Sequence, residues 1–180
     1  MTAFAYAPVP NGPQQDALAR GVLFLHSCPR AVTSHVCWAL GAAVEAQVSL
    51  DWSEQPIEPG TMRAELLWSG PVGTATKMAS ALVAFPMLRF EVTEEPVGGQ
   101  GGERFAGTPN LGMFRGDMGE YGDILVPEER LRSALAAATN GTLMLAEQIA
   151  RLIGEPWDRE LEPYRFAHEG STVRVLTKVV

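Results

Sequence analysis

The sequence predicts an α+β fold of the ferredoxin-like kind, in which a duplicated βαβ unit forms an antiparallel four-stranded sheet with two helices on one face. Two observations carry this prediction. The pattern of residues 49–57 returns in residues 89–97, and hydrophobic periodicity places a strand, a helix and a strand in each half of residues 21–98. A C-terminal extension made of a hairpin, two helices and a strand is expected to follow.

The chain of 180 residues divides into three parts. Residues 1–20 hold three prolines and a polar run, so we expect a flexible N-terminal arm. Residues 21–98 are the duplicated unit, and residues 99–180 are an α/β extension that we expect to pack on it. With 46% hydrophobic residues the chain can bury an ordinary core.

The first half opens with a continuous apolar run at residues 21–26, which is typical of a strand covered on both faces. Pro29 suits the first turn of a helix, and the helix that follows carries an apolar stripe through Val36 and Leu40. Apolar and polar residues then alternate over residues 48–53, which predicts a half-buried strand.

The second half repeats this order, with strands over residues 62–68 and 88–93 and a helix through Met78 and Leu82 between them. When residues 22–40 are laid on 64–82, and 48–57 on 88–97, the identical pairs are Leu25/Leu67, Ser27/Ser69, Pro29/Pro71, Ala39/Ala81, Leu40/Leu82, Glu54/Glu94 and Pro56/Pro96. The alternative is two unrelated βαβ units that share common turn chemistry.

The sheet face away from both helices is expected to be polar with an apolar middle. Its expected members are Ser49, Asp51, Arg63, Glu65, Arg89 and Glu91, together with Leu23, Leu25 and Leu67. An apolar middle needs cover, and we expect either the C-terminal part of the chain or a second subunit to supply it, which makes a homodimer one of the options.

The C-terminal extension starts after the glycine-rich residues 97–102, which are typical of a linker or a wide loop. Residues 103–126 resemble an irregular hairpin. Pro127 favours a helix start, and that helix should run to about residue 138. A second helix should end at Gly154, a Pro- and acid-rich segment follows, and residues 172–179 close the chain as a strand.

Charge and cysteine content exclude several classes of function. The net charge is −7 without a basic stripe, so nucleic acid and anionic membranes are poor partners. Two cysteines, Cys28 and Cys37, do not make a disulfide framework, and we expect a cytoplasmic protein. His35 and Cys37 lie two residues apart on a helix and cannot converge on one ion, so we predict neither a metal nor a cofactor.

Two groups of residues are candidates for ligand binding, and no catalytic set is predicted. His26, Arg30 and His35 surround the end of the first strand and the start of its helix, where a small acidic ligand could bind. Asp51, Arg63 and Arg89 share the polar sheet face with other charges. The alternatives are structural histidines and cross-strand ion pairs in contact with water.

Several segments together resemble an actinobacterial family of unknown function, the DUF3145 family. They are His26-Ser27, Pro29-Arg30, His35, Trp38-Ala39, Leu50-Asp51-Trp52, residues 59–65 and 92–96, Leu111-Gly112, Phe114-Arg115 and Val126-Pro127-Glu128. The resemblance covers about Arg20 to the C-terminus. It implies a cytosolic bacterial protein with no established activity, and it suggests enzymes of type II fatty-acid synthesis as partners.

Three hypotheses on function follow. The first is a non-enzymatic binding or regulatory module with a protein or a small acidic ligand as partner. The second is a small-substrate enzyme with an anion site near His26, Arg30 and His35. The third, which rests on the resemblance, is an accessory partner of fatty-acid synthesis enzymes.

Overall fold

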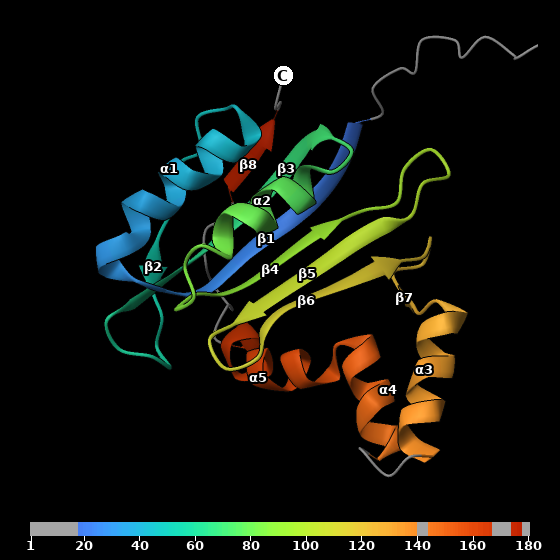
Figure 1. Cartoon of the computed structure of the whole chain (residues 1–180). Coiled ribbons are helices and arrows are strands. Elements are labelled where there is room, and N and C mark those ends of the chain that lie inside the picture. The colour runs from blue at the N-terminus through green and yellow to red at the C-terminus, as the bar shows by residue number, and fades with distance from the viewer. Residues whose placement is uncertain (1–17, 140–143, 167–173, 178–180) are drawn as a thin grey trace, which may run out of the picture.

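The structure, a computed structural model, describes residues 18–139, 144–166 and 174–177 (Figure 1). It is an α+β fold in which seven strands form an antiparallel sheet in the order β2-β3-β1-β4-β5-β6-β7, and β8 pairs in parallel with β3. The strands are β1 (Leu18–Pro29), β2 (Ser53–Glu54), β3 (Thr61–Pro71), β4 (Arg89–Glu94), β5 (Gly102–Thr108), β6 (Gly112–Met118), β7 (Ile124–Leu125) and β8 (Arg174–Thr177). The helices are α1 (Thr33–Val44), α2 (Thr74–Leu82), α3 (Glu128–Thr139), α4 (Leu145–Ile153) and α5 (Glu155–Phe166), with a short 3-10 helix (Arg30–Val32) before α1.

The main core lies between the sheet and the layer formed by α1 and α2 (Figure 1). Alternate residues of each strand point to this side. Leu23 of β1 lies between its partners Leu66 of β3 and Val92 of β4, and all three are buried. The expectation that Leu23 and Leu25 lie on the polar face is therefore wrong. A continuous apolar run shows no alternation, so the sequence alone does not reveal which of its residues face the helices.

The strand predicted at residues 48–53 is also wrong in extent, because only Ser53 and Glu54 pair, with Arg63 and Met62 of β3. The physical reason is competition for one edge of β3. From Leu66 onward that edge is occupied by β8. Val48 and Leu50 are still buried, but in a segment outside the strands.

Beyond β4 the sheet continues without a break. The glycine-rich run turns the chain into β5, which pairs with β4 along its length, and Gly98 and Gly99 adopt the positive φ angles that this turn requires. The predicted arm, residues 1–20, overlaps β1, which starts at Leu18, while residues 1–17 lie outside the described residues.

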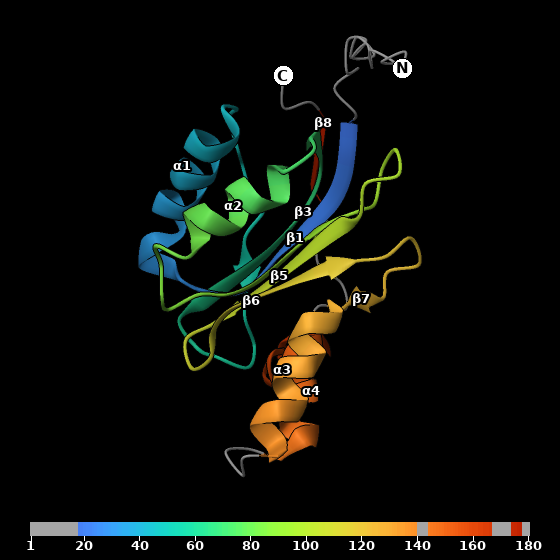
Figure 2. The ribbon, with the colours of Figure 1, turned by 45° about the vertical axis from the view of Figure 1, so that its right-hand side comes forward.

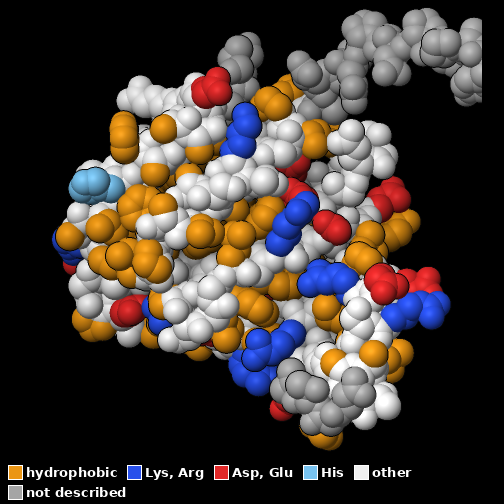
Figure 3. All heavy atoms as spheres, viewed as in Figure 1, with side chains coloured by type: hydrophobic (Ala, Val, Ile, Leu, Met, Phe, Trp, Pro, Cys, Tyr) orange, Lys and Arg blue, Asp and Glu red, His pale blue; other side chains and the backbone are white. Residues whose placement is uncertain are grey.

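Helix α5 covers part of the second sheet face, and Trp157 and Leu161 form a smaller core there with Ala106 and Phe114. Helices α3 and α4 project from the β7 edge as a hairpin (Figure 2). On the opposite side of the molecule, apolar side chains are spread over the surface of the α1 and α2 layer (Figure 3), where Trp38 is 77% exposed. No helix within the described ranges is long and apolar enough to cross a membrane.

Candidate functional site

The most concentrated polar chemistry lies on the sheet face opposite α1 and α2, around Glu91 of β4. This carboxylate is 6% exposed. His26 Nε2 on β1 lies 2.7 Å from Glu91 Oε2. Arg165 of α5 donates from Nε and Nη2 to the two carboxylate oxygens at 2.9 and 2.6 Å, and Arg104 Nη2 of β5 donates to Oε1 at 2.8 Å.

Asp158 of α5 completes this group. It accepts hydrogen bonds from both arginines, at 2.6 Å from Arg165 Nη2 and at shorter range from Arg104. We call His26, Glu91, Arg104, Asp158 and Arg165 the Glu91 cluster. Two carboxylates and two guanidinium groups balance in charge within it. A cluster that neutralises its own charges holds α5 on the sheet and leaves little attraction for an external ion.

The ionisation of the two carboxylates reflects these contacts. Burial disfavours the charged form of Glu91, but hydrogen bonds from His26 and Arg165 outweigh it and hold the pKa of Glu91 well below its usual range. Burial acts in the same direction on Asp158, and hydrogen bonds from Arg104 and Arg165 again lower its pKa. Both groups are therefore charged at neutral pH. An ionised Glu91 can only accept, so Nε2 of His26 carries the proton.

A second group of contacts, the Glu58 cluster, surrounds Arg89 of β4. Arg89 Nη1 lies 2.8 Å from Oε2 of Glu58, and Ser27 Oγ donates to the same oxygen at 2.6 Å. The Arg89 guanidinium carbon stands 4.8 Å from the centre of the Tyr164 ring, which is within the range of a cation–π contact. Glu160 of α5 approaches Arg89 Nε at 3.5 Å. This cluster, too, binds α5 to the sheet.

A cavity of about 250 Å³ opens beside the Glu91 cluster and is lined by Phe24, His26, Glu91 and Arg165. The Phe24 and His26 rings are stacked, with centroids 5.7 Å apart and planes 9° from parallel. This volume lies below the range of about 300–1,000 Å³ that is typical of small-molecule sites. The polar groups that line the cavity, those of His26, Glu91 and Arg165, already form hydrogen bonds and ion pairs with one another. This arrangement favours a structural role over chemistry on a substrate.

The structure distributes the sequence-predicted residues unevenly. His26 and Arg89 reach the same sheet face, in the two clusters. Arg63 of β3 is 9% exposed and donates from Nε to Ser53 Oγ at 3.2 Å. The remaining three predicted residues lie outside both clusters: exposed Arg30 pairs with Glu54 at 2.7 Å, His35 is exposed on α1, and Asp51 lies in the loop before β2. His26 contacts Glu91 on the face opposite α1, whereas His35 is exposed on α1, so the structure does not bring these two histidines together.

Sequence reasoning missed Glu58, Arg104, Asp158 and Arg165. Glu58 follows Pro56 in a loop and carries no periodic signal. The other three stand in segments that the sequence marks only as a hairpin and an acid-rich stretch. Their one shared signal is the predicted polar face around Glu91, because a buried carboxylate requires cations from some other part of the chain.

The buried thiol of Cys28 is not a reactive site. Burial raises the pKa of the Cys28 thiol to about 12, and Cys37 adds to this shift. A thiol with so high a pKa is a poor nucleophile and a poor metal ligand at neutral pH. Within the part of the chain that the structure describes, no three His, Cys, Asp or Glu side chains are grouped to hold a metal ion.

The lowered pKa values predict a loss of stability in acid. A carboxylate with a lower pKa in the folded state stabilises the protein above its unfolded pKa, and this contribution is lost as the pH falls through the folded pKa. With ordinary values of 4.5 for Glu91 and 3.8 for Asp158, the contribution of these two groups to the free energy of unfolding should be constant near neutral pH and decline below about pH 4.5. Urea unfolding between pH 7 and pH 3 measures this, and Glu91→Gln should flatten the decline. An equally steep decline in that variant would contradict the assignment.

Comparison with known proteins gives one informative result. No curated protein and no solved structure matches the chain. A family model described as a protein of unknown function, DUF3145, matches residues 22–178. The match includes every residue of both clusters and the α3–α4 hairpin. It covers far more than half of the sequence, so this chain belongs to the DUF3145 family.

Proposed function

We propose that this protein is a non-enzymatic binding module, in which the sheet and its α1 and α2 layer form a scaffold and the α3–α4 hairpin binds a protein partner. The contacts on the polar sheet face support a structural role there, because their charges are balanced internally. The enzyme hypothesis loses its motivation, since His26 and His35 lie on opposite sides of the sheet.

The observation that carries this proposal is the exposure of large apolar side chains along the hairpin. They are Leu131 (39% exposed) and Leu135 (54%) of α3, Ile149 (39%) and Ile153 (40%) of α4, and Met144 (73%) just before α4. The first four are spaced by four residues within each helix, so they lie on one side of it. We call these four residues the outer strip. Apolar side chains grouped in this way mark surfaces that bind other proteins.

The attachment of the hairpin also favours a recognition role. Helix α4 has no buried residue among those described, so it contributes little to either core. It ends at Gly154, whose positive φ of 86° lets the chain turn directly into α5. Helix α5 is in turn held by the Glu91 and Glu58 clusters. The hairpin therefore projects from an anchored base (Figure 2). The four side chains of its outer strip are exposed.

We further infer that residues 18–94 are a duplicated βαβ unit of the ferredoxin-like kind. Its support is the neighbour order β2-β3-β1-β4 and the place of α1 and α2 on the same face after β1 and β3. In this interpretation the duplicated unit is the scaffold, and the strands and helices after β4 add the binding function.

Site-specific photocrosslinking tests the binding role. A benzophenone amino acid at Leu135 should give one dominant protein adduct in cells of the native host, because the outer strip lies against the partner. The same group at Trp38, which is more exposed but lies on α1, is the matched control and should give no dominant adduct. Adducts from position 38 and none from position 135 would move the interface to the helix layer and contradict the proposal.

A further inference from the structure

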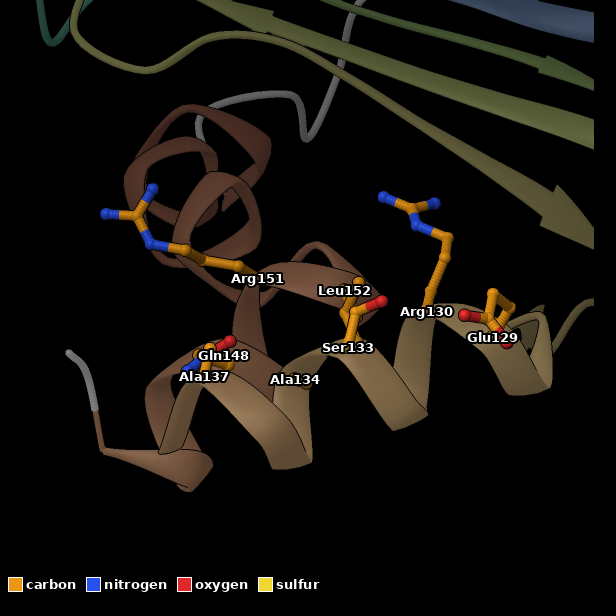
Figure 4. Close-up of a pocket in the computed structure, with 8 residues that line it drawn as sticks. All are labelled: Glu129, Arg130, Ser133, Ala134, Ala137, Gln148, Arg151 and Leu152. Atoms are coloured by element: carbon orange, nitrogen blue, oxygen red, sulfur yellow. The ribbon is translucent and has the colours of Figure 1, made fainter. Parts of the chain in front are cut away.

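A groove of about 460 Å³ lies between α3 and α4, on a different side of the hairpin from the outer strip. Helical periodicity separates the two surfaces, because Ala134 and Ala137 line the groove while Leu131 and Leu135 do not. Figure 4 shows the side chains of Arg130 from α3 and Arg151 from α4 extending to the same side of the hairpin. Two cationic groups from two helices thus border one hollow.

These two arginines differ from most others in the protein. Arg30, Arg89, Arg104, Arg115, Arg132, Arg159 and Arg165 each have a carboxylate within ion-pair distance. Neither Arg130 nor Arg151 has such a partner among the described residues. In a chain of net charge −7, two arginines outside ion pairs beside one groove attract an anion, and they outnumber Glu129, the one carboxylate among the residues that line it.

The groove supplies further hydrogen-bond donors. Gln148 Nε2 is buried and has no hydrogen-bond partner in the described part of the chain, and Ser133 places a hydroxyl on the same lining. A buried amide without a partner is costly, and an acceptor from a ligand would satisfy it. The remaining lining is apolar, with the small side chains of Ala134 and Ala137 and the larger Leu152. The small side chains of Ala134 and Ala137 on α3 leave the hollow between this helix and α4.

We propose that this groove binds a small organic phosphate, with the phosphate attracted by the exposed guanidinium groups of Arg130 and Arg151 and an apolar body over the alanines. A phosphate monoester carries about −1.5 to −2 charges at neutral pH and three strong acceptor oxygens, which matches two guanidinium forks and the amide donor. A single carboxylate would balance only one arginine. The volume falls within the range of about 300–1,000 Å³ that small-molecule sites occupy. Glu129 at the edge disfavours ligands with additional negative charge.

Titration of the full chain with phenyl phosphate, followed by calorimetry and by the side-chain amide signals of Gln148, tests this site. Each of Arg130→Gln and Arg151→Gln should weaken binding about tenfold or more, because a charge-assisted hydrogen bond is lost. Arg132→Gln and Arg159→Gln are matched controls, since both arginines are exposed and already paired with Glu128 and Glu155. These control variants should bind as the unaltered protein does.

Three results would overturn the proposal: no binding of phenyl phosphate at millimolar concentration, equal losses in the control variants, or signals of Gln148 that do not move on binding. Inorganic phosphate should bind more weakly than phenyl phosphate, because it has no apolar body to pack on the alanines. Equal affinity would contradict a contact between the alanines and the apolar part of the ligand. The groove and the outer strip are tested by different measurements. A failed titration therefore leaves the protein-binding role standing, and a failed crosslink leaves the phosphate site standing.

Discussion

Replacing Glu91 with alanine should lower the free energy of unfolding by about 3–5 kcal/mol, the cost of removing one partner from a buried ionic group. The change leaves buried His26 without its carboxylate and removes one of the two anions shared by Arg104 and Arg165. The side chains of His26, Arg104 and Arg165 would then border an empty space where the Glu91 carboxylate had been. Urea unfolding monitored by circular dichroism at pH 7 measures the effect as a lower midpoint concentration.

The matched control for this prediction is Glu128→Ala. Glu128 also pairs with an arginine, Arg132, but both side chains are largely exposed, and exposed pairs contribute little. A loss of stability in the Glu91 variant no larger than in this control would mean that the Glu91 cluster is not an anchor. Hydrogen exchange adds a local measurement, since weakened anchoring should increase exchange in α5 before it does so in the core strands.

Part of the fold could be predicted from the sequence because the relevant signals are local. The helix expected from Pro127 to about residue 138 is confirmed as α3, and the one expected to end at Gly154 is confirmed as α4. In both cases the apolar spacing and the terminating residue lie within the helix itself. The α+β class follows from the same kind of evidence.

The errors arise where distant segments decide the outcome. β2 is short because β8, more than a hundred residues later, pairs with the same edge of β3. Helix α5 was not predicted, because Pro156 and Pro163 and a high acid content argue against a helix in isolation. Its stability comes from tertiary contacts, namely the packing of Trp157 and Leu161 and the ion pairs of Arg165.

In the candidate site, too, the local pattern could be predicted from the sequence and the long-range contacts could not. The alternation of β4 placed Arg89 and Glu91 on the polar face, and both lie there. The sequence could not show which residues complete their clusters, since Arg104 comes from β5 and Asp158 and Arg165 come from α5. A buried carboxylate indicates that cations are needed, but only the packing of α5 determines which ones.

Replacing Trp157 with alanine should cost about 3–5 kcal/mol of unfolding free energy, as for other large aromatic residues removed from a core. Trp157 is 8% exposed, its ring centre lies 5.3 Å from that of Phe114, and its Nε1 donates to the Gly112 carbonyl at 3.0 Å. The loss combines the cavity with the lost hydrogen bond to the Gly112 carbonyl.

Trp157→Phe is the matched variant, because it keeps an aromatic ring against Phe114 and removes mainly the hydrogen bond, which contributes about 0.5–1.5 kcal/mol. Urea unfolding of both variants separates the two parts. If α5 is the base on which the hairpin stands, Trp157→Ala should also weaken the adduct formed from position 135, although Trp157 itself lies outside the outer strip. If Trp157→Ala lowers the free energy of unfolding but leaves the adduct from position 135 unchanged, the hairpin binds its partner independently of α5. A packing defect in α5 can weaken binding by the hairpin only if α5 holds the hairpin in place.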